Sequence, residues 1–145
     1  MARYWAAKEA LFSWAGLQAA VINIDDAQGA HLAQRLGASG LAVWTCSRRG
    51  SARLQARDLR SAEGLTFELT EGAEVRTLRT GLMGDYNIDN LLGVIGSLRA
   101  LGVSLADAVL ACTHVTAVPG RMQRVQSVAN PPNEPLVVVD YAHTP

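Results

Sequence analysis

The chain has 145 residues, and its thirteen basic side chains balance thirteen acidic ones, so that its formal net charge is zero. This balance argues against a protein that binds nucleic acid or a membrane surface through a general basic field. Hydrophobic residues make up 49% of the chain and charged residues 18%, which is typical of a folded globular domain and too apolar for a disordered segment.

The cysteines and the apolar runs limit the class of protein further. Cys46 and Cys112 are far apart in the sequence, and neither has a second Cys or a His at metal-ligand spacing, so neither a zinc site nor a disulfide scaffold is predicted. We interpret them as the reduced thiols of a cytoplasmic protein. No apolar run approaches the ~20 residues of a membrane-spanning helix, and the sequence has no signal-peptide pattern.

The first third of the chain alternates helix and strand. Residues 3–15 predict a helix, and Gly16 follows it as a stop signal. The continuous apolar runs at 19–24 and 41–44 are typical of strands that are buried on both faces of a parallel sheet. A predicted helix over 27–36 lies between them, which gives the element order of an α/β domain.

The pattern changes in the middle of the chain. Residues 53–59, 65–69 and 74–78 alternate apolar and polar side chains, which predicts an antiparallel meander with one solvated face. The remaining expected elements are a helix from Asp85 to the turn at Gly102, a second helix from its cap Ser104 to about Cys112, and strands near 122–128 and 136–139. The chain begins almost within a helix and stops directly after an apolar strand, so we expect it to be a piece of a longer protein.

Lys8 is the only lysine among the thirteen basic residues. On a helical wheel it falls among Tyr4, Leu11 and Phe12, away from the other polar residues of its helix. Either its amine snorkels to the surface, or the amine is buried, and desolvation keeps it neutral and nucleophilic. A coding bias toward arginine explains the other twelve basic residues.

Other polar residues occur where α/β proteins place their ligands. Asp25 and Asp26 follow the first strand, and capping of the next helix is favoured over metal binding. Two amides at helical spacing are either a helix cap and a surface amide or a pair that binds a ligand, and one loop arginine is either solvated or part of a site. Two further residues follow the last strand, where open α/β sheets place their ligands. These residues are Asn87, Asn90, Arg121, Asp140 and His143.

Three absences limit what the residues alone can predict. The sequence has no phosphate-binding P-loop, no nucleophile elbow with a Ser-His-Asp arrangement, and no His/Cys metal cluster. Without further information, the sequence therefore predicts part of an α/β protein with a possible site around the last strand.

Five segments, in order and spanning nearly the whole chain, together resemble the motifs of the Mur ligases, the ATP-dependent amide-bond-forming enzymes of peptidoglycan synthesis. These segments are YWAAK at 4–8, VINIDD at 21–26, GDYNIDNLL at 84–92, VPGRM at 118–122 and VVDYAHTP at 138–145. The last segment is similar to the MurE type, the UDP-N-acetylmuramoyl-L-alanyl-D-glutamate:amino-acid ligases. One departure is Gln123, because family members commonly carry Glu after the Gly-Arg-Met sequence.

The resemblance implies the place of the chain in a three-domain enzyme. Residues 1–121 would form the C-terminal half of the central ATPase domain, with a mostly parallel sheet, helices and a small antiparallel meander. Residues 122–145 would begin a Rossmann-like C-terminal domain. The UDP-sugar domain and the P-loop would lie upstream, so the chain alone would be inactive.

The resemblance also implies the reaction and its partners. ATP phosphorylates the D-glutamate carboxylate of UDP-MurNAc-L-Ala-D-Glu, and the amine of meso-diaminopimelate, or of lysine, attacks the acyl phosphate. The complete enzyme would be a cytoplasmic monomer with no nucleic-acid partner. The alternatives are a ligase similar to cyanophycin synthetase and a nucleotide-binding module without catalysis.

The resemblance assigns roles to the candidate residues. Lys8 matches a lysine that is carbamylated in Mur ligases, and its carbamate oxygens would bind Mg²⁺. Asn87 and Asn90 match positions near the adenine, Arg121 an arginine near the ribose and phosphates, and Asp140 a ligand of the ribose hydroxyls. His143 would line the same cleft, whereas Asp25 and Asp26 would be structural.

Overall fold

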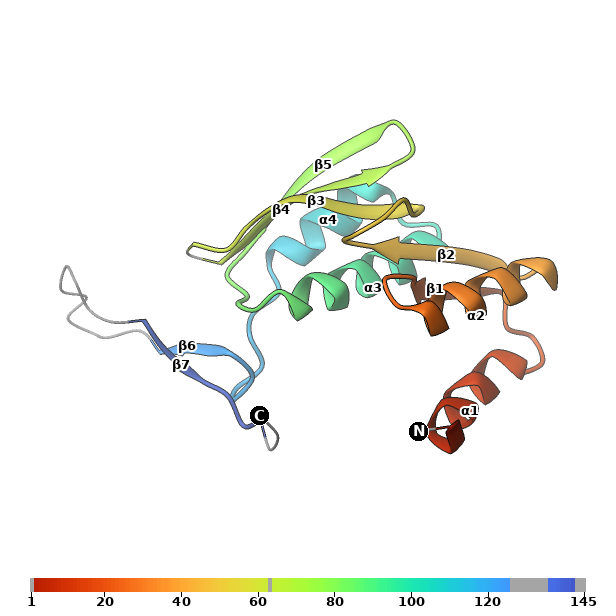
Figure 1. The fold of residues 1–145 in the computed structure, drawn as a ribbon. Helices are drawn as coiled ribbons and strands as arrows, with labels where there is room; N and C mark the ends of the chain where they lie inside the picture. The colour runs from red at the N-terminus through yellow and green to blue at the C-terminus, as the bar shows by residue number, and fades with distance from the viewer. Residues whose placement is uncertain (1, 63, 126–135, 143–145) are drawn as a thin grey trace.

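A five-stranded sheet forms the centre of the molecule (Figure 1). The computed structural model of the protein describes residues 2–62, 64–125 and 136–142. The strands lie in chain order across the sheet: β1 (Ala19–Asn23), β2 (Ala42–Ser47), β3 (Leu54–Arg60), β4 (Leu65–Glu71) and β5 (Glu74–Thr80). The predicted α/β class is confirmed.

The parallel strands and the antiparallel meander form one mixed sheet. β1 pairs with β2 and β2 with β3 in parallel, whereas β3, β4 and β5 pair antiparallel. Parallel neighbours usually need a long crossover connection. Here the loop between β2 and β3 is short, because the end of β2 pairs with the start of β3, Cys46 opposite Leu54. The meander therefore extends the sheet beyond the carboxyl ends of β1 and β2.

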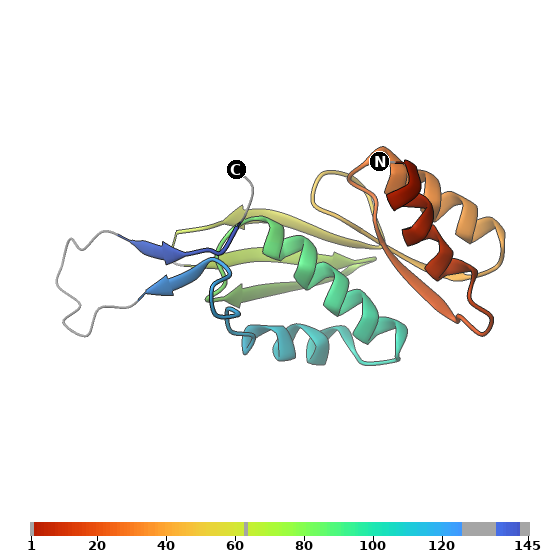
Figure 2. The ribbon, with the colours of Figure 1, turned by 90° about the horizontal axis from the view of Figure 1, so that it is seen from below.

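Helices cover both faces of the parallel part of the sheet. α3 (Tyr86–Ala100) packs on one face of β1, β2 and β3, and α4 (Leu105–Thr113) lies beside it against β5. α2 (Ala27–Ala38) covers β1 and β2 on the other face (Figures 1 and 2). Successive residues of β1 point to opposite faces, so that Ala20 and Ile22 contact the α2 side and Val21 the α3 side.

The two helices with a side-chain cap, α2 and α4, begin where the sequence predicts. The Asp26 side chain accepts a hydrogen bond from the Gly29 N–H at 2.8 Å, and Ser104 accepts one from the Asp107 N–H at 3.1 Å. The first helix is shorter than predicted, since α1 spans Ala2–Ala10 and a single 3₁₀ turn, η1 (Leu11–Ser13), follows it. No helix among the described residues is long and apolar enough to span a bilayer.

A small hairpin follows the main sheet. β6 (Gln123–Val125) and β7 (Val137–Val139) pair antiparallel and form a separate two-stranded sheet. The rest of the strand predicted near 122–128 lies outside the described residues. Both cysteines are free and buried, as expected for reduced thiols, and burial raises the pKa of the Cys46 thiol to about 12.

Candidate functional site

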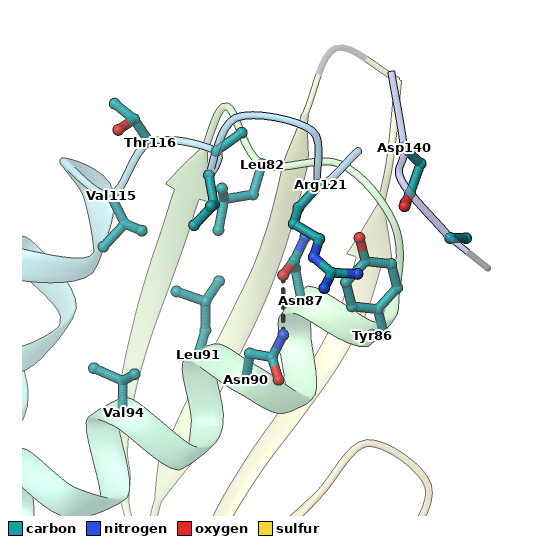
Figure 3. A pocket seen from close by; sticks show the side chains of 13 residues that line it. Leu82, Tyr86, Asn87, Asn90, Leu91, Val94, Val115, Thr116, Arg121 and Asp140 are labelled. Carbon is teal, nitrogen blue, oxygen red and sulfur yellow. Dashed lines mark hydrogen bonds between the residues drawn. The ribbon is translucent and has the colours of Figure 1, made fainter. Parts of the chain in front are cut away.

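A cavity of about 520 Å³ lies between the N-terminal half of α3, the segment after α4 and the segment after β7 (Figure 3). Its volume falls within the usual range of small-molecule sites. The cavity is lined by Leu82, Tyr86, Asn87, Asn90, Leu91, Val94, Val115, Thr116, Ala117, Val118, Arg121, Asp140 and Ala142.

Four of the predicted site residues line this one cavity. Asn87 and Asn90 come from the first turns of α3, Arg121 from the loop before β6, and Asp140 from the end of β7. The side chains of Asn90, Arg121 and Asp140 are exposed, so a ligand in the cavity can reach them. His143 lies outside the described residues.

The two asparagines form a hydrogen-bonded pair. Asn90 Nδ2 donates to Asn87 Oδ1 at 3.0 Å, and Asn87 Nδ2 donates to the Met83 carbonyl at 2.7 Å (Figure 3). These bonds fix the orientation of both amides, and among the described residues the Asn90 side-chain oxygen accepts no hydrogen bond. The pair is therefore ordered in advance to accept a hydrogen bond from a ligand.

Two charged side chains add different chemistry to the cavity. Figure 3 shows the Arg121 side chain extending toward Tyr86 and the asparagine pair, whereas Asp140 enters from the β7 side. Arg121 offers a cation and Asp140 a carboxylate acceptor. The apolar lining was not anticipated from the sequence and consists mainly of Leu82, Leu91, Val94, Val115 and Val118.

Gly120 joins the two walls that carry Arg121 and Asp140. Its N–H donates to Gln123 Oε1 at 3.0 Å, and its carbonyl accepts from the Tyr141 N–H at 2.8 Å. Its φ is +74°, and a Cβ there would lie 2.3 Å from the Tyr141 ring, so only glycine fits. Gln123, whose contribution the sequence left open, thus holds this turn, and a glutamate oxygen could accept the same bond.

The two aspartates after β1 have structural partners. Asp26 caps α2, and Asp25 accepts hydrogen bonds from the Ser47 hydroxyl and from the N–H groups of Arg48 (2.8 Å) and Arg49 (3.2 Å). Burial alone raises the pKa of Asp25, but these hydrogen bonds outweigh it and lower the pKa below the ordinary value of 3.8. This confirms the capping prediction for Asp26 and a structural role for Asp25.

Lys8 is exposed and does not line the cavity, and its helix α1 lies at the other end of the molecule from β6 and β7 (Figures 1 and 2). Its Nζ is 4.7 Å from the centre of the Tyr4 ring, a cation–π contact at the surface. Of the two predicted alternatives, an amine at the surface and a buried neutral amine, the described residues show the amine at the surface. Among the described residues, no group of three or more His, Cys, Asp or Glu side chains could hold a metal ion, so these residues do not complete a magnesium site.

Comparisons with known proteins identify relatives over the full chain. The protein is 51% identical to the UDP-N-acetylmuramoyl-L-alanyl-D-glutamate–2,6-diaminopimelate ligase of Acidovorax sp. (strain JS42), with all of this chain and 28% of the relative covered. It is 47% identical to the ligase of the same name from Janthinobacterium sp. (strain Marseille), of which it covers 29%. The chain therefore spans less than a third of the length of these curated relatives.

A solved structure gives the same result for the fold. The structure of a UDP-N-acetylmuramoyl-L-alanyl-D-glutamate–2,6-diaminopimelate ligase superposes with a TM-score of 0.81 at 30% identity, covering 97% of this chain and 29% of that one. The family described as Mur ligase middle domain matches residues 1–98. The chain belongs to this Mur ligase family.

Proposed function

We propose that the cavity is the nucleotide site of an ATP-dependent ligase that adds meso-diaminopimelate, or lysine, to UDP-MurNAc-L-Ala-D-Glu. The observation that supports this proposal is the meeting of Asn87, Asn90, Arg121 and Asp140 on one cavity, although they come from three separate segments. The relatives from Acidovorax and Janthinobacterium carry the name of a diaminopimelate ligase, which favours diaminopimelate over lysine.

Each wall of the cavity has a role in holding the nucleotide. The apolar side chains around Leu91 and Val94 would cover the faces of the adenine, and the Asn90 carbonyl would accept a hydrogen bond from its amino group. Asp140 would accept hydrogen bonds from the ribose hydroxyls, and Arg121 would neutralise phosphate charge. The cavity therefore combines an apolar slot for a base with polar groups for the sugar and phosphates.

The proposed reaction proceeds in two steps. The substrate carboxylate attacks the terminal phosphorus of ATP and releases ADP, and the incoming amine then attacks the acyl phosphate and releases phosphate. Lys8, with its accessible amine, is the proposed site of carbamylation, and the carbamate would contribute oxygen ligands to Mg²⁺. When bound, Mg²⁺ supplies charge neutralisation for the transferred phosphoryl group.

The proposal includes a domain boundary and a cellular location. Residues 1–121 would belong to the central domain and 122–145 would begin the C-terminal domain, which the separate pairing of β6 with β7 supports. His143 is proposed as a further lining residue of the same cleft. A cytoplasmic location agrees with the two free thiols.

Nucleotide affinity of the full-length protein tests the site. Asn90→Ala and Asp140→Ala should each raise the Kd for ATP about tenfold, because each removes one hydrogen-bonding group worth about 1 kcal/mol or more. Glu68→Ala, an exposed carboxylate on β4, is the control and should leave the Kd unchanged. Calorimetric titration with ATP gives all three values. Unchanged affinity in both site variants would remove the nucleotide-site assignment.

A further inference from the structure

A polar cluster lies on the other side of α3 from the nucleotide cavity. Arg48 Nε is 2.9 Å from Asp89 Oδ1, and Arg48 Nη1 is 3.6 Å from Asp85 Oδ2. Asn23 Nδ2, at the end of β1, also donates to Asp89 Oδ1, at 3.1 Å. One arginine thus links the carboxyl ends of the parallel strands to the first turn of α3.

The cluster is partly withdrawn from water. The Arg48 side chain is 19% exposed and the Asp89 side chain 28%, so their ion pair is screened less than a surface pair. Arg48 is also fixed at its backbone, since its N–H donates to Asp25 Oδ2 at 2.8 Å. Asp25 in turn accepts from the hydroxyl of Ser47, which is buried. The guanidinium is therefore anchored to the sheet before it reaches the helix.

Two aspartates in the first turns of α3 face this cluster. Asp85 occupies the N-cap position but makes no capping hydrogen bond with its side chain. Its carboxylate, like that of Asp89, faces Arg48 instead. At ~100° per residue, Asp85 and Asp89 point about 150° away from Asn87 and Asn90 around the helix. The first turns of α3 are thus held by Arg48 on one side and present the asparagine pair to the cavity on the other.

We propose that Arg48 is a positioning residue of the nucleotide site. By holding Asp85 and Asp89, it fixes how the N-terminus of α3 is rotated and how closely it packs on the sheet. The positions of the Asn87 and Asn90 amides are fixed as a result. It does not line the cavity itself. This inference rests on the proposed function, because the consequence of moving the asparagine pair is read through nucleotide binding.

The KM values of the full-length ligase distinguish positioning from general stability. Arg48→Ala should raise the KM for ATP about tenfold while leaving kcat at saturating ATP and the KM for the UDP-linked substrate nearly unchanged, since it affects the binding of one substrate only. Arg48→Lys should restore part of the affinity, because an ammonium can pair with one of the two carboxylates. Arg49→Ala is the matched control, an exposed neighbouring arginine that should behave like the parent.

The outcomes separate this inference from the proposed function. If Asn90→Ala raises the KM for ATP but Arg48→Ala does not, the positioning role is overturned and the nucleotide site stands. If neither does, the nucleotide site itself is wrong. An equal rise in the KM values of all substrates would also overturn the inference, because it would indicate a general structural defect. If Arg48→Ala fails to fold, Asp89→Asn decides by the same measurements, since it removes the charge that pairs with Arg48 and keeps an acceptor oxygen.

Discussion

Lys8 stands in solvent although the sequence placed it on an apolar face of its helix. The cation–π contact confirms Tyr4 as its neighbour, but Leu11 and Phe12 fall in the 3₁₀ turn beyond α1. Tyr4 is 62% exposed and Leu11 51%, so the described residues leave these two side chains largely uncovered. An amphipathic pattern shows which side chains lie together and not whether another element covers them. The described residues therefore leave the amine in solvent and do not supply the burial that would keep it neutral.

The carbamate proposal predicts a specific defect at this residue. In the full-length ligase, Lys8→Ala should lower kcat at least about a hundredfold, because the proposed metal ligand is lost. Added bicarbonate or short carboxylates should restore part of the turnover. Lys8→Arg should stay inactive, since a guanidinium remains protonated and forms no carbamate. Arg3→Ala, on the same helix, is the control, and full activity of Lys8→Ala without additives would end the proposal.

Asp25 gives the molecule a pH-dependent contribution to stability. Its folded-state pKa is lowered because hydrogen bonds from Ser47, Arg48 and Arg49 favour the carboxylate more than burial disfavours it. A lowered pKa stabilises the folded state above the unfolded value of about 3.8, and this contribution is lost as the pH falls through the lower folded pKa.

Asp25→Asn should therefore lower the free energy of unfolding and change its dependence on pH. We expect the free energy of unfolding to fall by about 1–2 kcal/mol at pH 7, because the amide has one acceptor oxygen for three donors. We also expect a flatter decline between about pH 5 and pH 2 than in the parent. Urea titrations at several pH values measure this, and parallel curves for the two proteins would contradict it.

At the scale of the elements, a second charged cluster lies at the C-terminal end of α3. Arg53 lies 3.2 Å over the Trp44 ring, and Arg99, at the end of α3, lies 5.6 Å from the ring centre. Glu71, at the end of β4, accepts from Arg99 Nε at 2.6 Å and lies 3.5 Å from Arg53 Nε. One carboxylate thus connects β3, β4 and α3 beside a buried tryptophan.

Glu71→Gln should weaken this connection measurably. The Glu71 side chain is 14% exposed, so removing its charge should cost about 1–3 kcal/mol of unfolding free energy, since two arginines lose their partner. Glu74→Gln is the matched control, because Glu74 pairs with Arg76 in solvent, where such pairs contribute about 0–1 kcal/mol. Denaturant midpoints of the two variants give the comparison, and equal losses would contradict the role of Glu71.

Periodicity predicted nearly every element, but not how the strands join. The alternation in 53–59 correctly indicated a half-solvated strand, yet it could not show that the start of β3 pairs in parallel with the end of β2. Arg48 was missed for the same reason. Its partners Asp85 and Asp89 are distant in sequence, and no local pattern relates an arginine after one strand to a helix elsewhere.

At the scale of the whole molecule, the cavity walls come from segments that only the tertiary fold brings together. The resemblance named Asn87, Asn90, Arg121 and Asp140, and the structure places all four on the cavity. The apolar lining and the Gly120 turn were not predicted, because their role depends on the docking of the β7 segment through Tyr141.

Gly120→Ala should therefore weaken ATP binding in addition to lowering the stability of the fold. The methyl group must displace the Tyr141 ring, and a positive φ costs alanine about 1–2 kcal/mol. We expect a several-fold higher Kd for ATP in the full-length protein. Gly72→Ala is the control, because Gly72 also has a positive φ, +59°, but nothing lies within 4 Å of its added methyl group. Calorimetry and thermal melts compare the two, and equal ATP affinities would rule out this role for Gly120.

The division of the cavity among three segments also determines when it can form during synthesis. The sheet, α3 and α4 are complete in sequence by Thr113, so the core can collapse as soon as that residue has left the ribosome. The wall that carries Asp140 arrives later and must dock onto a surface that is already folded. A ligand that contacts all three segments favours the docked state over the undocked one by mass action. Nucleotide present during synthesis would then act as a folding partner for the last segment of the chain.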